Sequence, residues 1–155
     1  MSLTATATGN AMSASSVLDT LQQLASKDVD EAAGRLAAAN ERLKQARDQL
    51  ALLQGYRQDY LDKLARQLSA GLDAQAHQNF QRFMRMLDQA IAGQQEVVRA
   101  AEQHADLGLQ SWRQSHKKKR SYEVLSDRSQ EKVRRVELKK EQKLMDEHAM
   151  RSRKP

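Results

Sequence analysis

Apolar residues recur every seven positions along the first half of this chain, and this heptad repeat constrains the fold more than any other feature. One series runs Val29, Leu36, Leu43, Leu50 and, after Arg57, Leu64; the other runs Leu18, Ala25, Ala32, Ala39, Ala46, Leu53 and Tyr60. Such a repeat places one apolar stripe along a long α-helix, and layers of leucine and alanine let a second helix approach closely. The pattern predicts a coiled coil.

The composition agrees with long helices and argues against sheets. Ala, Leu, Lys, Arg and Glu make up 76 of the 155 residues, only eight residues are Val or Ile, and the one proline is the last residue. This mixture is typical of coiled coils. The chain has no cysteine, which excludes disulfides and cysteine-based zinc sites. No apolar run approaches the roughly 18 residues that a membrane-spanning helix needs.

A break at Ser69–Asp73 divides the pattern into two helices, because Gly71 can end one helix and Asp73 can cap the next. We expect an all-α chain of two long helices, over about 16–68 and 75–150, joined by a turn over about 69–74. They would form one antiparallel coiled-coil domain over 16–155. A capping-box sequence at Ser16–Asp19 marks the expected start, after a flexible tail over 1–15 without a secretory signal.

The basic residues gather in the part of the second helix that the hairpin leaves unpaired. A turn near 71–72 pairs positions whose numbers add up to about 143, so the chain beyond about 128 forms a helical overhang. Residues 116–155 hold 14 basic and 7 acidic residues, whereas residues 1–115 hold 12 basic and 13 acidic. The run Lys117–Arg120 suits phosphates or an acidic lipid surface, but acids follow at Glu123, Asp127 and Glu131, as on a solvated helix. The mixture favours a protein-docking face over a nucleic-acid site, because a leucine-zipper DNA reader places a basic region before its zipper.

The seam of the predicted hairpin consists of the two heptad series of the first helix and of a matching apolar series in the second helix. That second series is Phe80, Met84, Leu87, Ile91, Gln94, Val98, Ala101, Ala105, Gly108 or Leu109, and Trp112.

A second stripe accompanies the seam in the middle of the predicted hairpin. It consists of Gln49, Leu53, Tyr56 and Tyr60 in the first helix and Phe83, Leu87, Ala90 and Gln94 in the second. Leu53, Tyr60 and Leu87 belong to the seam. Gln49, Tyr56, Phe83 and Ala90 lie to one side of it, where a two-helix coil leaves aromatic surface exposed. Exposed aromatic clusters are common interface anchors; the alternative is a wider core completed by a helix from another chain.

The sequence contains no catalytic constellation. It lacks a phosphate-binding glycine loop, a nucleophile elbow and a metal-spaced histidine pair, and its four histidines lie far apart. We expect no enzyme activity, no metal and no cofactor.

Several segments resemble the flagellar export protein FliJ family, in order and at matching spacing from about residue 17 to the end. They are Leu18–Leu21, Asp28–Ala33, Tyr56–Tyr60, Asn79–Phe83, Leu87–Ile91, Ser111–Arg113, Leu125–Arg128 and a C-terminal signature, Glu141–Arg151. The resemblance implies a cytoplasmic component of the bacterial type III export apparatus, built like the central stalk of rotary ATPases and without catalysis of its own.

The resemblance also implies partners: the hexameric export ATPase FliI, the export-gate protein FlhA at the inner membrane, and export chaperones. It implies that the eight-residue stripe binds the gate, with Gln94 as a departure because a histidine can stand there in relatives. We expect contacts with the ATPase ring on the overhang, at Lys132, Arg135, Lys139, Lys143, Asp146, Glu147 and Arg151. Two other functions stay open: a generic secretion chaperone that holds clients on the exposed apolar side, and nucleic-acid binding through residues 117–140.

Overall fold

The computed structural model describes residues 4–153, with side chains described over 14–153, as two long helices and a short turn. Helix α1 spans Thr4–Ala70 and helix α2 spans Ala74–Ser152, and the described residues contain no strand. The chain divides into two compact units. We call Ala32–Trp112 the turn unit, and the described parts of Met1–Glu31 and Arg113–Pro155 the terminal unit. The all-α hairpin is confirmed; the single domain over 16–155 stays a prediction.

The turn between the helices has the two features that its sequence predicts. Gly71 adopts a φ of 91°, and its amide donates a hydrogen bond to the Leu68 carbonyl at 3.3 Å. A side chain at this φ would be strained, so glycine suits the position. The Asp73 carboxylate accepts a hydrogen bond of 2.7 Å from the Ala76 amide and so caps α2. Both roles are confirmed.

Asp73→Ala is expected to lower the free energy of unfolding by about 1 kcal/mol, because the first turn of α2 loses the acceptor of its free amide. Urea unfolding followed by circular dichroism measures the change. Asp59→Ala is the matched control, since Asp59 is exposed in the middle of α1 and caps no helix. Equal losses in the two variants would contradict a capping role for Asp73.

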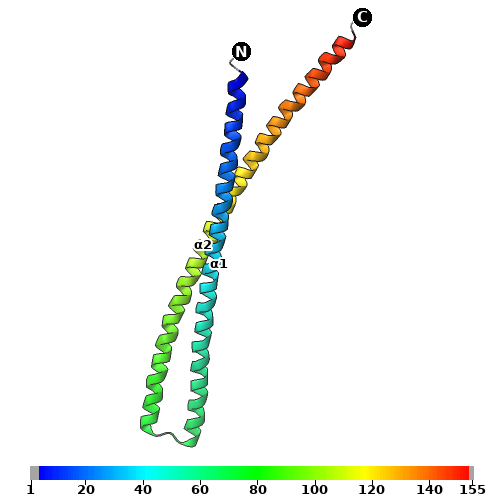
Figure 1. Cartoon of the computed structure of the whole chain (residues 1–155). Helices are drawn as coiled ribbons and strands as arrows, with labels where there is room; N and C mark the ends of the chain where they lie inside the picture. The colour runs from blue at the N-terminus through cyan, green and yellow to red at the C-terminus, as the bar shows by residue number, and fades with distance from the viewer. Residues whose placement is uncertain (1–3, 154–155) are drawn as a thin grey trace. The chain divides into compact units, whose positions relative to one another are not determined.

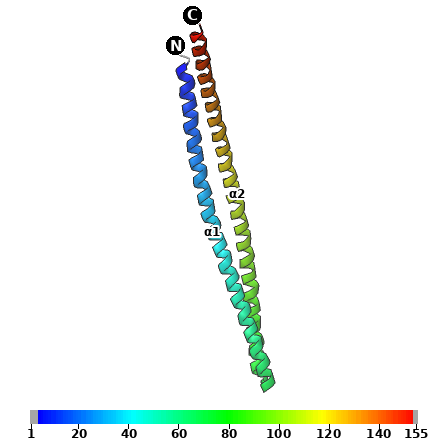
Figure 2. The ribbon, with the colours of Figure 1, turned by 90° about the vertical axis from the view of Figure 1, so that its right-hand side faces the viewer.

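The core of the turn unit combines buried alanines of α1 with buried side chains of α2 that are mostly larger. Figures 1 and 2 show the two helices running antiparallel from the turn. The buried residues of this unit are Ala32, Ala39 and Ala46 in α1 and Phe80, Leu87, Val98 and Ala105 in α2. The backbones come close at Gly108, where an added Cβ would lie 3.6 Å from the Leu36 Cα. Near the turn, the Tyr60 ring lies 4.3 Å from the ring of Phe80 and 4.2 Å from that of Phe83, measured between centroids.

The terminal unit has a thinner core, and its packing ends well before α2 does. Ala25 and Val29 are buried there. Leu18 and Ser126 are the outermost described residues that are not fully exposed, and every residue over 127–153 is exposed. Figure 1 shows this end of α2, in orange and red, diverging from the blue N-terminal part of α1. The predicted helical overhang is confirmed, but its predicted cause is not, because α1 continues to Thr4 and does not end opposite residue 127.

The predicted start of the first helix is wrong. Helix α1 begins at Thr4, so residues 4–15 of the expected tail are helical, and residues 1–3 lie outside the described part of the chain. Ser16 lies within the helix, and its carbonyl accepts a hydrogen bond of 3.0 Å from the Thr20 hydroxyl. Extending an existing helix needs no new nucleus, so a capping sequence alone does not end it.

Candidate protein-docking site

One side of the turn unit is closed by ion pairs that cross between the helices. Arg47 donates to the Glu102 carboxylate at 3.1 Å, and Arg57 donates to Asp88 at 2.7 Å. Arg47, Glu102 and Asp88 each stand one residue after a seam position. Arg57 occupies a seam position itself, and its bond to Asp88 explains how an arginine is accommodated there. We call this side the ion-paired flank.

The opposite side carries six exposed large apolar side chains. They are Leu52 and Tyr56 in α1 and Phe83, Met86, Val97 and Leu107 in α2, with exposed fractions between 40% and 63%. Each lies one residue before a seam position, and on a helix this placement falls on one side of the seam. We call this set the apolar flank. In the turn unit, Leu68 is the one exposed large apolar residue outside it.

The structure divides the predicted stripe into exposed residues and seam residues, as the sequence predicts. Gln49, Tyr56, Phe83 and Ala90 are exposed, whereas Leu87 is buried and Leu53 and Tyr60 are half-buried. Phe83 rests on the Tyr60 ring, so an exposed aromatic is fixed to the core. Whether these residues bind a partner stays a prediction.

Gln94 takes part in the seam and turns away from solvent. It is half-buried, and its side-chain amide donates a hydrogen bond of 3.0 Å to the Ala46 carbonyl. Its share in a docking surface is therefore small, because its donor is already used within the hairpin.

Sequence reasoning missed four members of the apolar flank. Leu52 lies four residues before Tyr56, and Met86 lies three residues after Phe83, so both adjoin the stripe on the helix surface. Val97 follows Ala90 by seven residues, and Leu107 extends the same side. Helical spacing was the available signal. The flank is accordingly wider and longer than the stripe.

The seven overhang residues predicted to meet the ATPase are all exposed. The spacing of Lys132, Arg135, Lys139 and Lys143 puts these four cations on one face of α2. Arg135 also donates to the Glu131 carboxylate at 3.3 Å, as an i,i+4 pair on a solvated helix does.

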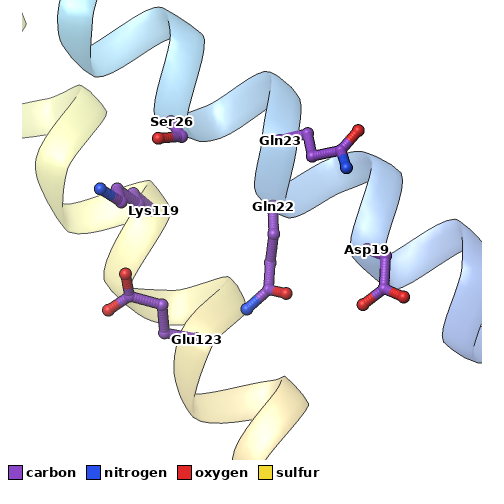
Figure 3. Close-up of a pocket in the computed structure, with 6 residues that line it drawn as sticks. All are labelled: Asp19, Gln22, Gln23, Ser26, Lys119 and Glu123. Carbon is purple, nitrogen blue, oxygen red and sulfur yellow. The ribbon is translucent and has the colours of Figure 1, made fainter.

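The terminal unit contains a small polar hollow between its helices. Figure 3 shows Gln22 extending from α1 toward Glu123 of α2. The other lining residues are Asp19, Gln23, Ser26 and Lys119. Lys119 is half-buried here, which separates it from the exposed Lys117, Lys118 and Arg120 of the basic run. All six lining residues are polar or charged, and their charges are of both signs, so the hollow reflects loose local packing and does not indicate a ligand site.

The described residues lack two other kinds of functional element. No group of three or more His, Cys, Asp or Glu side chains is placed to hold a metal ion. None of the helices in this part of the chain has the length and apolar content needed to cross a membrane.

Comparisons with known proteins connect this hairpin to one family. The family model described as "Flagellar FliJ protein" matches residues 14–153, which include the whole turn unit and the described overhang. The chain belongs to the flagellar FliJ family. The FliJ protein of Escherichia coli (strain K12) is 33% identical over 140 residues, which cover 89% of this chain and 95% of the relative. The FliJ protein of Salmonella typhi is 34% identical over the same shares. The predicted family is confirmed, and both the apolar flank and the overhang are therefore features of a FliJ-family chain.

Proposed function

We propose that this protein is a component of flagellar protein export that acts as the stalk of the export ATPase ring. The observation that carries the proposal is the overhang, in which every residue over 127–153 is exposed. A lone polar helix of this length is marginal in water, so it gains stability where another molecule surrounds it. A pore lined by acidic loops in the FliI hexamer would suit the cations at 132, 135, 139 and 143.

The proposal includes coupling of the stalk to the export gate. The apolar flank supplies exposed apolar side chains along one side of the hairpin, with two aromatic anchors, Tyr56 and Phe83, of the kind that protein interfaces use. Binding of the gate protein FlhA to this flank would place the protein at the cytoplasmic face of the inner membrane, as a peripheral component. Export chaperones are further partners in this proposal, and no cofactor, metal or catalytic residue takes part.

Addition of the protein to purified FliI tests the stalk function. We expect ATP hydrolysis to rise and the protein to migrate with the ATPase hexamer, because a stalk that favours one state of a ring shifts its working equilibrium. Absence of both stimulation and association would contradict the proposal.

The exposed apolar flank also favours a second candidate, a secretion chaperone that holds export clients. Such a chaperone would form stoichiometric complexes with unfolded clients and would leave ATP hydrolysis unchanged. The ATPase assay therefore separates the two functions, since only the stalk predicts stimulation.

A further inference from the structure

The apolar flank continues, away from the turn, into a groove with a basic rim. Its lining residues are Arg35, Ala38, Ala39 and Arg42 of α1 and His104, Leu107 and Gly108 of α2. Arg35 and Arg42 each lie one residue before a seam leucine, Leu36 and Leu43. Tyr56 lies one residue before Arg57 in the same way, so the three residues share one heptad position. His104 holds the position of Phe83 in the same way. The groove and the aromatic anchors therefore share one side of the turn unit.

The two arginines of this groove are unlike those of the ion-paired flank. Neither Arg35 nor Arg42 forms an ion pair with any described side chain, whereas Arg47 and Arg57 both do. Arg42 has no acidic residue three or four positions before or after it. A guanidinium presents a fork of donors that fits a carboxylate. The guanidinium groups of Arg35 and Arg42 are both without an acidic partner among the described side chains, and both line the groove together with Leu107.

We propose that this side of the turn unit docks an acidic amphipathic segment of the gate protein, an inference that rests on the gate-binding part of the proposed function. Apolar side chains of the segment cover Tyr56 and Phe83, and its carboxylates pair with Arg35 and Arg42. Tyr56 and Arg35 lie 21 residues apart, which is about 32 Å along a helix. The segment is therefore several helical turns long, with its acids toward one end.

The charge of the groove selects an acidic protein segment over a nucleic acid. Phosphate binding needs cations spread along the contact, but the other half of this side is occupied by Leu52, Tyr56, Phe83 and Met86. A segment with both apolar and acidic side chains complements both halves.

The experiment compares two charge reversals in the full chain. Arg35→Glu with Arg42→Glu alters the groove, and Lys44→Glu with Arg82→Glu is the matched control. Lys44 and Arg82 are exposed in the same unit. Lys44 lies one residue after Leu43, and Arg82 lies two residues before Met84, so neither side chain is on the side of the groove. Both variants change the net charge equally. Affinity for the purified cytoplasmic part of FlhA is measured by calorimetry at low and high salt, with helicity checked by circular dichroism.

We expect the groove variant to bind about tenfold more weakly than the wild type at low salt, with a smaller dependence on salt, and the control to stay within about twofold. Arg35→Lys with Arg42→Lys should keep most of the affinity, because it retains both charges. If the wild type binds and the groove variant binds equally well, the inference is wrong while the proposed function stands. If the wild type does not bind FlhA, gate coupling itself fails, and the inference with it. Binding to duplex DNA that the groove variant alone loses would overturn the inference in favour of a phosphate site.

Discussion

A chain that ends at Ser126 is expected to bind the export gate as the full chain does, but to leave FliI hydrolysing ATP at the rate of the ATPase alone. Every residue beyond Ser126 is exposed over the described range to Arg153, so the truncation removes no buried side chain that the structure describes and leaves the turn unit intact. It removes the whole overhang, which in the proposed function is the part that enters the ring. Steady-state ATP hydrolysis and calorimetric binding to FlhA measure the two effects side by side.

A pair of charge reversals within the overhang is the control for the truncation. Lys132→Glu with Lys139→Glu alters the face that also carries Arg135 and Lys143, whereas Arg134→Glu with Lys140→Glu makes the same change in charge at two positions outside that face. We expect the first pair to weaken ATPase stimulation more than the second. Full stimulation by the chain that ends at Ser126 would exclude the overhang as the ring-binding element.

The turn and the core of the hairpin could be predicted from the sequence because local chemistry and the heptad repeat agree there. Gly71 adopts a φ that favours glycine, and the Asp73 carboxylate caps the next helix, so this pair of residues marks the turn in the sequence. Their position then determines which residues face each other across the hairpin. It explains why Arg57 meets Asp88 and why Gln94 reaches the Ala46 carbonyl.

The N-terminal boundary of α1 could not be predicted, because the signal at Ser16 is weak beside the tendency of a helix to continue. A cap contributes about 1 kcal/mol, and the same serine is tolerated inside a helix. The stretch before it contains alanine and no proline, so nothing stops the helix before Thr4. A local capping sequence is therefore evidence of a permitted start, not of an obligatory one.

The candidate site was predicted in its centre and missed at its edges for a related reason. Tyr56 and Phe83 were found because aromatic residues are rare in this chain. Leu52 and Met86 resemble the many other apolar residues of a coiled coil. Their spacing puts them beside the seam, but only the structure shows how far they are exposed, 47% for Leu52 and 61% for Met86. Whether an apolar residue beside a seam is buried depends on how closely the helices approach, which the heptad pattern alone does not specify.

Tyr56→Ala with Phe83→Ala is expected to weaken binding to FlhA by about 100-fold, because aromatic anchors at the centre of an interface commonly contribute more than 1 kcal/mol each. The two side chains come from different helices and are 51% and 40% exposed. Phe83 also packs on Tyr60, so its loss should lower the stability of the hairpin by about 1 kcal/mol or more. Calorimetric binding to FlhA and thermal unfolding followed by circular dichroism measure the two effects.

Tyr56→Ala alone and Leu68→Ala separate recognition from stability. Tyr56 and Leu68 lie in the same helix and are 51% and 52% exposed, but Leu68 lies outside the apolar flank. Because both substitutions remove similar exposed apolar surface, we expect similar small changes in unfolding and about tenfold weaker gate binding for Tyr56→Ala only. Binding as tight as that of the wild type by both variants would show that the gate does not contact the apolar flank. Strong loss in both would place the contact nearer the turn, around Leu68, and would move the proposed docking surface away from the groove at Arg35 and Arg42.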